Sequence, residues 1–135
     1  MQEYIDNPML IDGCKFDLRI YVLLRSLDPL RIYVYKEGLC RLATSKYVKP
    51  DESNFRNDKM HLTNYAINKW DPGFIANKDI NHDDKGHKRS YTSIIKYLAS
   101  NSFDTVKIEQ RIDSIIVRTI LSAYTKMLRS YRKAR

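Results

Sequence analysis

Three charged residues at alternate positions, Lys15, Asp17 and Arg19, offer the clearest chemistry in the sequence. They lie in a run over residues 15–25 in which apolar and polar side chains alternate, the pattern of a β-strand. Because successive side chains of a strand point to opposite faces, all three project from one face, opposite an apolar face expected to meet the core. Two cations flanking one carboxylate suit a nucleotide phosphate, with the carboxylate holding the lysine or binding a ribose hydroxyl. A solvated outer face of the sheet is the alternative interpretation.

Two further groups have the chemistry to complete such a site. Arg41 lies two residues beyond Leu39, which we expect to pack inward, and its guanidinium suits a carboxylate or phosphate. An ordinary surface arginine is the alternative. The segment 61–65, His-Leu-Thr-Asn-Tyr, gathers hydrogen-bonding side chains in a stretch without clear periodicity. It is either a structural turn or a ligand-binding loop, and its pattern does not choose between them.

Other common kinds of site lack their sequence pattern. The four glycines are scattered, at positions 13, 38, 73 and 86, and form no glycine-rich phosphate loop. The three histidines lack a metal-ligand spacing. Cys14 and Cys40 form neither a metal motif nor a disulfide framework, which favours a reducing, intracellular setting. No apolar run approaches the roughly 20 residues that span a bilayer.

The elements that position these residues follow the order strands, loop, helices, which predicts an α+β fold with a single core. An antiparallel meander is expected over residues 15–44, with turns at Asp28-Pro29 and at Glu37-Gly38. The expected parts are strands at 15–25, 30–35 and 39–44, a ligand loop at 60–69, a mobile loop at 70–88, and helices at about 90–100 and 104–130. Ser90 is expected to cap the first helix, and the second is expected to begin near Asp104.

The formal charge of +8 favours anionic partners. From Ser114 onward the chain contains no Asp or Glu and six basic residues, which suit either an anionic partner or a solvated helix end. No nucleic-acid recognition motif accompanies the charge. We therefore expect neither a nucleic acid nor a membrane as the partner.

Several stretches, in this order and at these spacings, resemble the tubulin tyrosine ligase-like family. They are Gln2-Glu3-Tyr4-Ile5, Asn7-Pro8, Ile11-Asp12-Gly13, residues 15–22, Asp28-Pro29-Leu30-Arg31, Tyr35, Glu37-Gly38-Leu39, Arg41, Ala43-Thr44 and residues 61–69. The match is close over residues 2–69 and looser over 86–89 and the two helices. The run Asn-Tyr-Ala-Ile-Asn-Lys is similar to the glutamylase branch of the family, whereas the tyrosine ligase and glycylase branches usually differ at Tyr65 and around Asn68.

The resemblance implies an ATP-grasp fold and a ligase that activates a carboxylate with ATP as an acyl phosphate, which an amino group attacks to form an amide. Arg19 matches a catalytic position near the reacting phosphate and the acceptor carboxylate. The matching ATP-binding positions are Gln2, Glu3, Tyr4, Ile5, Lys15, Asp17, Thr63 and Asn64, with Lys15 on the phosphate or nucleobase side and Asp17 on the ribose side. The matching amino-acid positions are Arg41, facing the substrate carboxylate, Tyr65 and Lys88.

The implied reaction adds free glutamate to glutamate side chains of tubulin C-terminal tails. It implies ATP and Mg²⁺ as cofactors, tubulin or microtubules as partners, and the cytoplasm and cytoskeleton, including the cilium or basal body, as the location. The family's magnesium ligands, an Asp and a later Glu-x-Asn, are expected beyond the final helix, and its phosphate-binding lysines upstream. We therefore expect a central segment of a longer protein, with no metal ligand of its own and inactive alone. A non-catalytic module that docks its basic helix on tubulin is the alternative, as is a tyrosine or glycine ligase of the same family.

Overall fold

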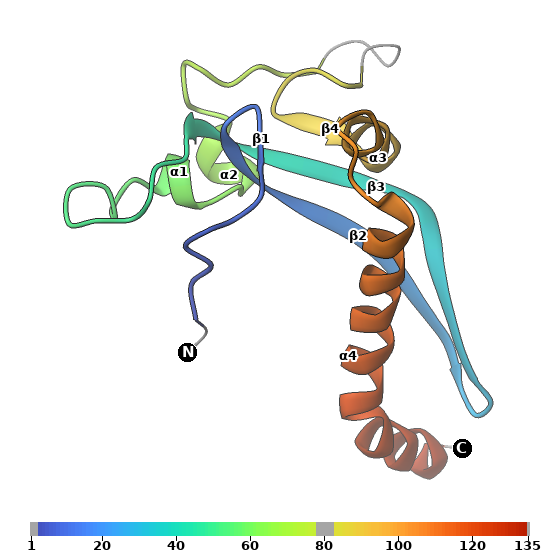
Figure 1. Ribbon diagram of the computed structural model, residues 1–135. Helices are drawn as coiled ribbons and strands as arrows, with labels where there is room; N and C mark the ends of the chain where they lie inside the picture. The colour runs from blue at the N-terminus through green and yellow to red at the C-terminus, as the bar shows by residue number, and fades with distance from the viewer. Residues whose placement is uncertain (1–2, 78–82, 135) are drawn as a thin grey trace. The chain divides into compact units, whose positions relative to one another are not determined.

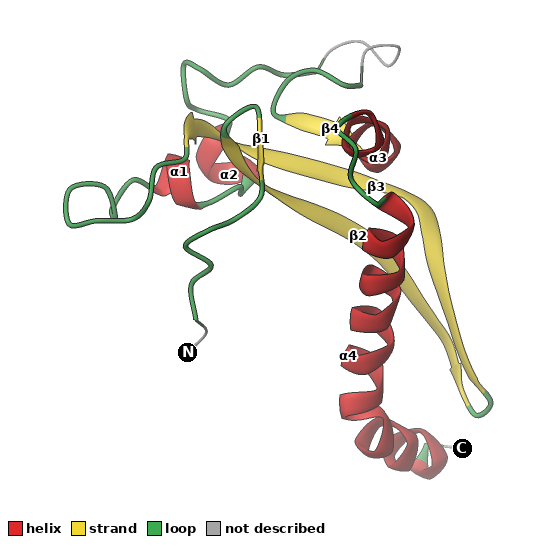
Figure 2. Cartoon of the chain, viewed as in Figure 1, coloured by secondary structure: helices red, strands yellow, loops and turns green. Residues whose placement is uncertain are grey.

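The computed structural model describes residues 3–77 and 83–134, which form strands and helices in an α+β arrangement, as predicted (Figure 1). The strands are β1 (Leu10–Ile11), β2 (Cys14–Leu27), β3 (Leu30–Lys46) and β4 (Lys88–Ser90). The helices are α1 (Asp58–His61), α2 (Tyr65–Asn68), α3 (Tyr91–Ser100) and α4 (Thr105–Lys133). Figure 2 distinguishes the strands in yellow from the helices in red, and along the chain the two longest strands precede all the helices.

The strands form one sheet in the order β1-β2-β3-β4. Only Asp28 and Pro29 separate β2 from β3, so these two long strands make a hairpin. At the edges, β1 pairs antiparallel with β2, and β4 pairs antiparallel with β3 so that Arg41 stands opposite Lys88. Lys88, expected in a loop, therefore begins a strand.

The turn predicted at Glu37-Gly38 is wrong, because β3 continues unbroken through both residues. Gly38 is buried inside the strand, and a Cβ atom added to it would lie 2.5 Å from the carbonyl oxygen of Arg19. A glycine within a strand marks a place where another backbone approaches closely. The absence of a side chain at Gly38 allows the backbone of β2 to approach, and β3 continues past this residue.

The described residues divide into two compact units, where chain length alone led us to expect a single core. The first unit comprises Met1–Arg19 and Gly38–Ile94, and the second comprises Ile20–Glu37 and Ile95–Arg135. The buried hydrophobic residues of the first unit are Ile11, Cys14, Cys40, Leu42, Ala43, Met60 and Ile94. Its core therefore combines β1, β3 and the first turns of α1 and α3 around the start of β2.

The inward-facing residues of the hairpin differ from those predicted. Leu39 was expected to pack inward, but the fully buried neighbours on β3 are Cys40 and Leu42, while Leu39 is half-buried. On β2 the predicted apolar face is only partly covered, and Val22 remains 39% exposed. In the second unit, α4 likewise has no buried residue.

The helices of the second unit begin and end near the predicted limits. The Asp104 side chain caps α4 by accepting a hydrogen bond from the Lys107 backbone at 2.9 Å, as expected for a helix N-terminus. The hydroxyl of Tyr124 on α4 donates to the carbonyl of Leu27 at 2.9 Å, which fixes the helix beside the end of β2 (Figure 1). No helix among residues 3–77 and 83–134 is long and apolar enough to cross a bilayer.

Candidate functional site

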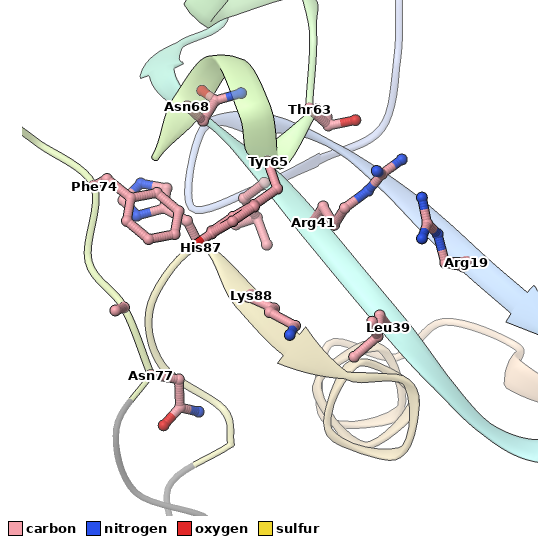
Figure 3. Close-up of a pocket in the computed structure, with 12 residues that line it drawn as sticks. Arg19, Leu39, Arg41, Thr63, Tyr65, Asn68, Phe74, Asn77, His87 and Lys88 are labelled. Atoms are coloured by element: carbon pink, nitrogen blue, oxygen red, sulfur yellow. The ribbon is translucent and has the colours of Figure 1, made fainter. Parts of the chain in front are cut away.

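A pocket of about 380 Å³ lies within the first unit. It is lined by Arg19 of β2, by Leu39, Arg41 and Leu42 of β3, and by Thr63, Tyr65 and Asn68 of residues 62–68, which include α2 and are here called the α2 segment. Phe74, Ala76 and Asn77 of the following loop and His87 and Lys88 at β4 complete the lining. Among the predicted site residues, the structure thus brings together Arg19, Arg41, Thr63, Tyr65 and Lys88 (Figure 3). These include every residue matched to an amino-acid contact.

The pocket is strongly cationic. Arg19, Arg41 and Lys88 line it, and the described lining residues include no Asp or Glu. Arg41 and Lys88 occupy directly opposed positions on neighbouring antiparallel strands. Like charges at opposed positions destabilise a sheet. The Asp17 carboxylate offsets part of this repulsion at Arg41, and an anion bound beside Lys88 would reduce it further. The arrangement therefore suits an anionic ligand.

Asp17 sets the direction of one of these cations. Its carboxylate accepts a hydrogen bond from Nε of Arg41 at 3.0 Å and a second from the same guanidinium at Nη2, so the pairing is bidentate. The two side chains are 21% and 36% exposed for Arg41 and Asp17. Sequence reasoning offered Lys15 as the partner of Asp17, but the alternation of β2 gave no sign of an arginine on β3 as the actual partner.

Lys15 belongs to a separate cluster outside the pocket. Its ammonium lies 4.1 Å from the centre of the Tyr4 ring, a cation–π contact. The Tyr4 hydroxyl and Nδ1 of His61 are 2.7 Å apart, and His61 Nε2 lies 3.1 Å from the carbonyl oxygen of Asn54. Because a carbonyl only accepts, Nε2 donates to it, and in a neutral ring Nδ1 accepts from Tyr4. Two residues matched to ATP binding, Tyr4 and Lys15, are thus held together.

Three more of the residues matched to ATP binding, Glu3, Ile5 and Asn64, are not in the pocket lining, whereas Thr63 is. Glu3 and Ile5 are exposed next to Tyr4, and Gln2 lies outside the described residues. Asn64 is exposed at the N-cap of α2, where its side chain makes no capping hydrogen bond. Its side chain is therefore not committed to capping the helix.

Asn68 anchors the α2 segment to the sheet and was missed as a site residue. Its side chain is buried, with an exposure of 1%. The amide oxygen accepts from the backbone and the hydroxyl of Thr44 at 3.0 and 2.8 Å, and the amide nitrogen donates to the carbonyls of Leu62 and Asn64 at 2.8 and 3.1 Å. All four hydrogen-bonding positions are thus used, which holds Thr63 and Tyr65 beside β3.

An aromatic wall closes one side of the pocket, also unpredicted. The rings of Phe74 and His87 stack with centroids 5.6 Å apart, and Tyr65 meets Phe74 edge-on at 5.8 Å (Figure 3). The backbone of Ile75 donates to His87 Nδ1 at 3.0 Å. Burial lowers the pKa of His87, so the ring is neutral near pH 7. The polar segment 70–88 carried no periodic signal from which this wall could have been inferred.

The described residues of this unit contain two cysteines, and both are buried. Burial raises the pKa of Cys40 to about 12 and also raises that of Cys14, so both thiols stay protonated at neutral pH. In the part of the chain that the structure describes, no group of three His, Cys, Asp or Glu side chains could hold a metal ion. What the pocket offers is binding and charge stabilisation of an anion.

Comparison with known proteins gives one consistent result. The model of the tubulin-tyrosine ligase family matches residues 1–135. A probable beta-tubulin polyglutamylase of Tetrahymena thermophila is 48% identical over 132 residues, which are 98% of this chain and 11% of that protein. Tubulin polyglutamylases TTLL7 and TTLL13 of Mus musculus are 44% and 46% identical over 135 and 131 residues, or 100% and 97% of this chain. The chain spans 14% and 16% of their respective lengths.

Proposed function

This chain belongs to the tubulin-tyrosine ligase family, and on that premise we propose that it forms the central part of an ATP-dependent ligase that adds glutamate to tubulin. The observation that carries the proposal is the pocket lined by Arg19, Arg41 and Lys88, which come from three strands (Figure 3). Free glutamate brings two carboxylates to such a site. The names of the polyglutamylases that align with the whole chain support glutamate over tyrosine or glycine.

The amino-acid substrate occupies the pocket beside Arg41, Lys88 and Tyr65. The pocket volume of about 380 Å³ is within the range of small-molecule sites. Arg41, held in place by Asp17, presents its guanidinium to a substrate carboxylate, and Lys88 opposite supplies a second cation. Arg19 stabilises the charge that develops as the acceptor carboxylate is phosphorylated and then attacked by the amino group.

ATP supplies the phosphoryl group that activates the acceptor carboxylate, and Tyr4, Lys15, Thr63 and Asn64 are the proposed residues that hold it. The Lys15 ammonium is the cation that Tyr4 positions for this role. Asp17 binds the ribose, since a carboxylate has about four acceptor positions and Arg41 uses two. Among the described residues, no group of three His, Cys, Asp or Glu side chains could hold a metal ion. In this proposal Mg²⁺ therefore accompanies ATP on ligands other than the described residues.

The same proposal places the fold in the ATP-grasp class and the protein in the cytoplasm at the cytoskeleton, with the cilium or basal body as a specific location. Microtubules are the proposed partner because their tubulin tails are acidic, opposite in sign to the net charge of +8.

The test is transfer of labelled glutamate to tubulin by the full-length protein, with ATP present and with tyrosine and glycine as competing substrates. Arg41→Ala and Lys88→Ala should each raise the KM for glutamate about 30-fold, because a hydrogen-bonded charged contact contributes about 2 kcal/mol. Arg31→Ala is the matched control, an exposed arginine on the same strand β3. It should leave every kinetic constant within twofold.

Two results would count against the proposal in different ways. A wild-type protein that transfers tyrosine or glycine in place of glutamate would refute the substrate. A wild-type protein that transfers glutamate with an unchanged KM in both variants would refute the pocket as the amino-acid site.

The exposed cations of α4 favour a second candidate, a module that binds tubulin without catalysis. Arg118, Lys126, Arg129 and Lys133 are all exposed on this helix. Binding through them should weaken steeply with salt. Co-sedimentation with microtubules that does not change between low and physiological salt would argue against this role.

A further inference from the structure

An exposed pair of aromatic rings with a lysine between them continues from the pocket onto the surface. The Lys69 ammonium lies 5.7 Å from the centre of the Tyr65 ring and 4.7 Å from that of Trp70. Tyr65 is 55% exposed and Trp70 79% exposed. Because Tyr65 also lines the pocket, the three residues, here called the Tyr65–Trp70 strip, lead away from the pocket.

The backbone under the strip is firmly held. The Lys69 amide donates to the Tyr65 carbonyl at 2.9 Å, and the Asp71 amide donates to the Asn68 carbonyl at 2.9 Å. Asn68 in turn is bound to β3 through Thr44. The strip is therefore presented on a fixed turn, which reduces the entropy lost when a partner binds.

The charge of the strip is not neutralised by the nearest carboxylate. Asp71 pairs with Lys59 at 2.7 Å and accepts from the Gly73 amide at 2.7 Å. Within residues 3–77 and 83–134, no carboxylate lies within ion-pair distance of Lys69. An exposed cation flanked by apolar rings, next to a pocket lined by three more cations, is complementary to an acidic segment.

We propose that the Tyr65–Trp70 strip binds the acidic acceptor peptide on its way to the pocket. The peptide is extended, places a carboxylate on Lys69 and packs its chain against the indole of Trp70. This inference rests on the proposed function, since it takes the acceptor to be a glutamate-rich tail whose reacting carboxylate reaches Arg19. The acceptor peptide would then enter the pocket from the side on which α2 lies.

The chain offers a matched control pair. Phe55 is 57% exposed and has the Arg56 guanidinium 5.3 Å from its ring centre, so it is also an exposed aromatic residue beside a cation. Neither residue lines the pocket. A general effect of surface aromatics or of net charge would appear equally at both pairs.

The experiment uses the full-length protein and a synthetic glutamate-rich peptide with the sequence of a tubulin C-terminal tail. Lys69→Ala and Trp70→Ala should each raise the KM for this peptide about tenfold and leave kcat and the KM values for ATP and free glutamate within twofold. Phe55→Ala and Arg56→Ala should leave all these constants within twofold. The KM for the peptide should also rise with salt in the wild type and rise less in Lys69→Ala.

Direct binding separates this inference from the proposed function. Anisotropy of the labelled peptide should show about tenfold weaker binding by both strip variants. If the wild-type protein transfers no glutamate but the strip variants still bind the peptide more weakly, the proposed function fails and the inference about the strip holds. Peptide binding that is unchanged in both strip variants, or that falls equally in the Phe55 and Arg56 variants, would overturn the inference. The inference would also be overturned if the strip variants changed the self-association of the protein, measured by light scattering, and left peptide binding intact.

Discussion

Replacing Asn68 with alanine should loosen the α2 segment from the sheet. The substitution removes four hydrogen bonds from a side chain that is 1% exposed and leaves donors of Thr44 and carbonyls of Leu62 and Asn64 without their partner. Each such bond contributes about 1 kcal/mol net, and water admitted to the cavity recovers part of it. We therefore expect a local loss of about 2–4 kcal/mol.

The backbone amide of Thr44 reports this loss directly, because it donates to Asn68 Oδ1 at 3.0 Å. Hydrogen exchange of a peptide covering residues 42–46 in the full-length protein should become about 30- to 700-fold faster at that amide, since every 1.4 kcal/mol is a factor of ten. Asn57→Ala is the control: Asn57 is exposed, and its side chain makes no capping hydrogen bond to α1. It should change exchange less than threefold.

A second variant distinguishes hydrogen bonding from packing. Asn68→Asp keeps the volume and the acceptor for Thr44, but it sets a carboxylate oxygen against the carbonyls of Leu62 and Asn64. It should accelerate exchange about as much as Asn68→Ala at neutral pH. Exchange in Asn68→Asp that matches the wild type would refute the reasoning that the two carbonyl bonds hold the segment.

Three further predictions follow from single contacts. Asp17→Asn should raise the KM for glutamate about tenfold, because the carboxylate holds Arg41 at a partly exposed site, and it should also raise the KM for ATP, because the same carboxylate is proposed to bind the ribose; an unchanged KM for glutamate would contradict the hold on Arg41. Gly38→Ala should destabilise the protein by about 1–3 kcal/mol, seen as a lower Tm, because its Cβ would lie 2.5 Å from the Arg19 carbonyl oxygen; an unchanged Tm would contradict that approach. The Cys40 thiol should resist iodoacetamide near pH 8 until urea is added, since burial raises its pKa to about 12 from 9.0. Because the pKa of Cys40 is higher in the folded than in the unfolded protein, the contribution of the buried thiol to stability falls as pH rises from 9.0 toward about 12. Labelling of Cys40 in the native protein would contradict both expectations.

Local pattern predicted the elements whose cause is local. The alternation of apolar and polar residues predicted the strand through residues 15–25. Asp104 predicted the start of α4, because its carboxylate caps the helix by accepting from the backbone amide of Lys107, three residues later. Glu37-Gly38 has the composition of a turn, but the reason for this glycine is the Arg19 carbonyl on another strand. Nothing near Gly38 in the sequence carries that information.

The candidate site divides in the same way. Resemblance selected Arg41, Tyr65 and Lys88, and the structure brings them into one pocket, although their individual roles stay predictions. Phe74 and His87 join them where the loop closes through two hydrogen bonds, from the Ile75 amide to His87 Nδ1 and from the His87 amide to the Ile75 carbonyl. The polar sequence of this loop has no helical or strand periodicity. Contacts that depend on such a closure leave no periodic trace along the chain.

The interleaved course of the chain has a consequence for its synthesis. Leu27 at the end of β2 receives its bond from Tyr124, 97 residues later. A ribosome adding about 5–20 residues per second would therefore leave the tip of the hairpin without its helix for about 5–20 s. During that time Tyr21, Val22 and Leu23, already 46%, 39% and 61% exposed in the finished fold, are exposed to solvent with still less cover. This nascent hairpin would therefore be open to binding by a holding chaperone until α4 is made.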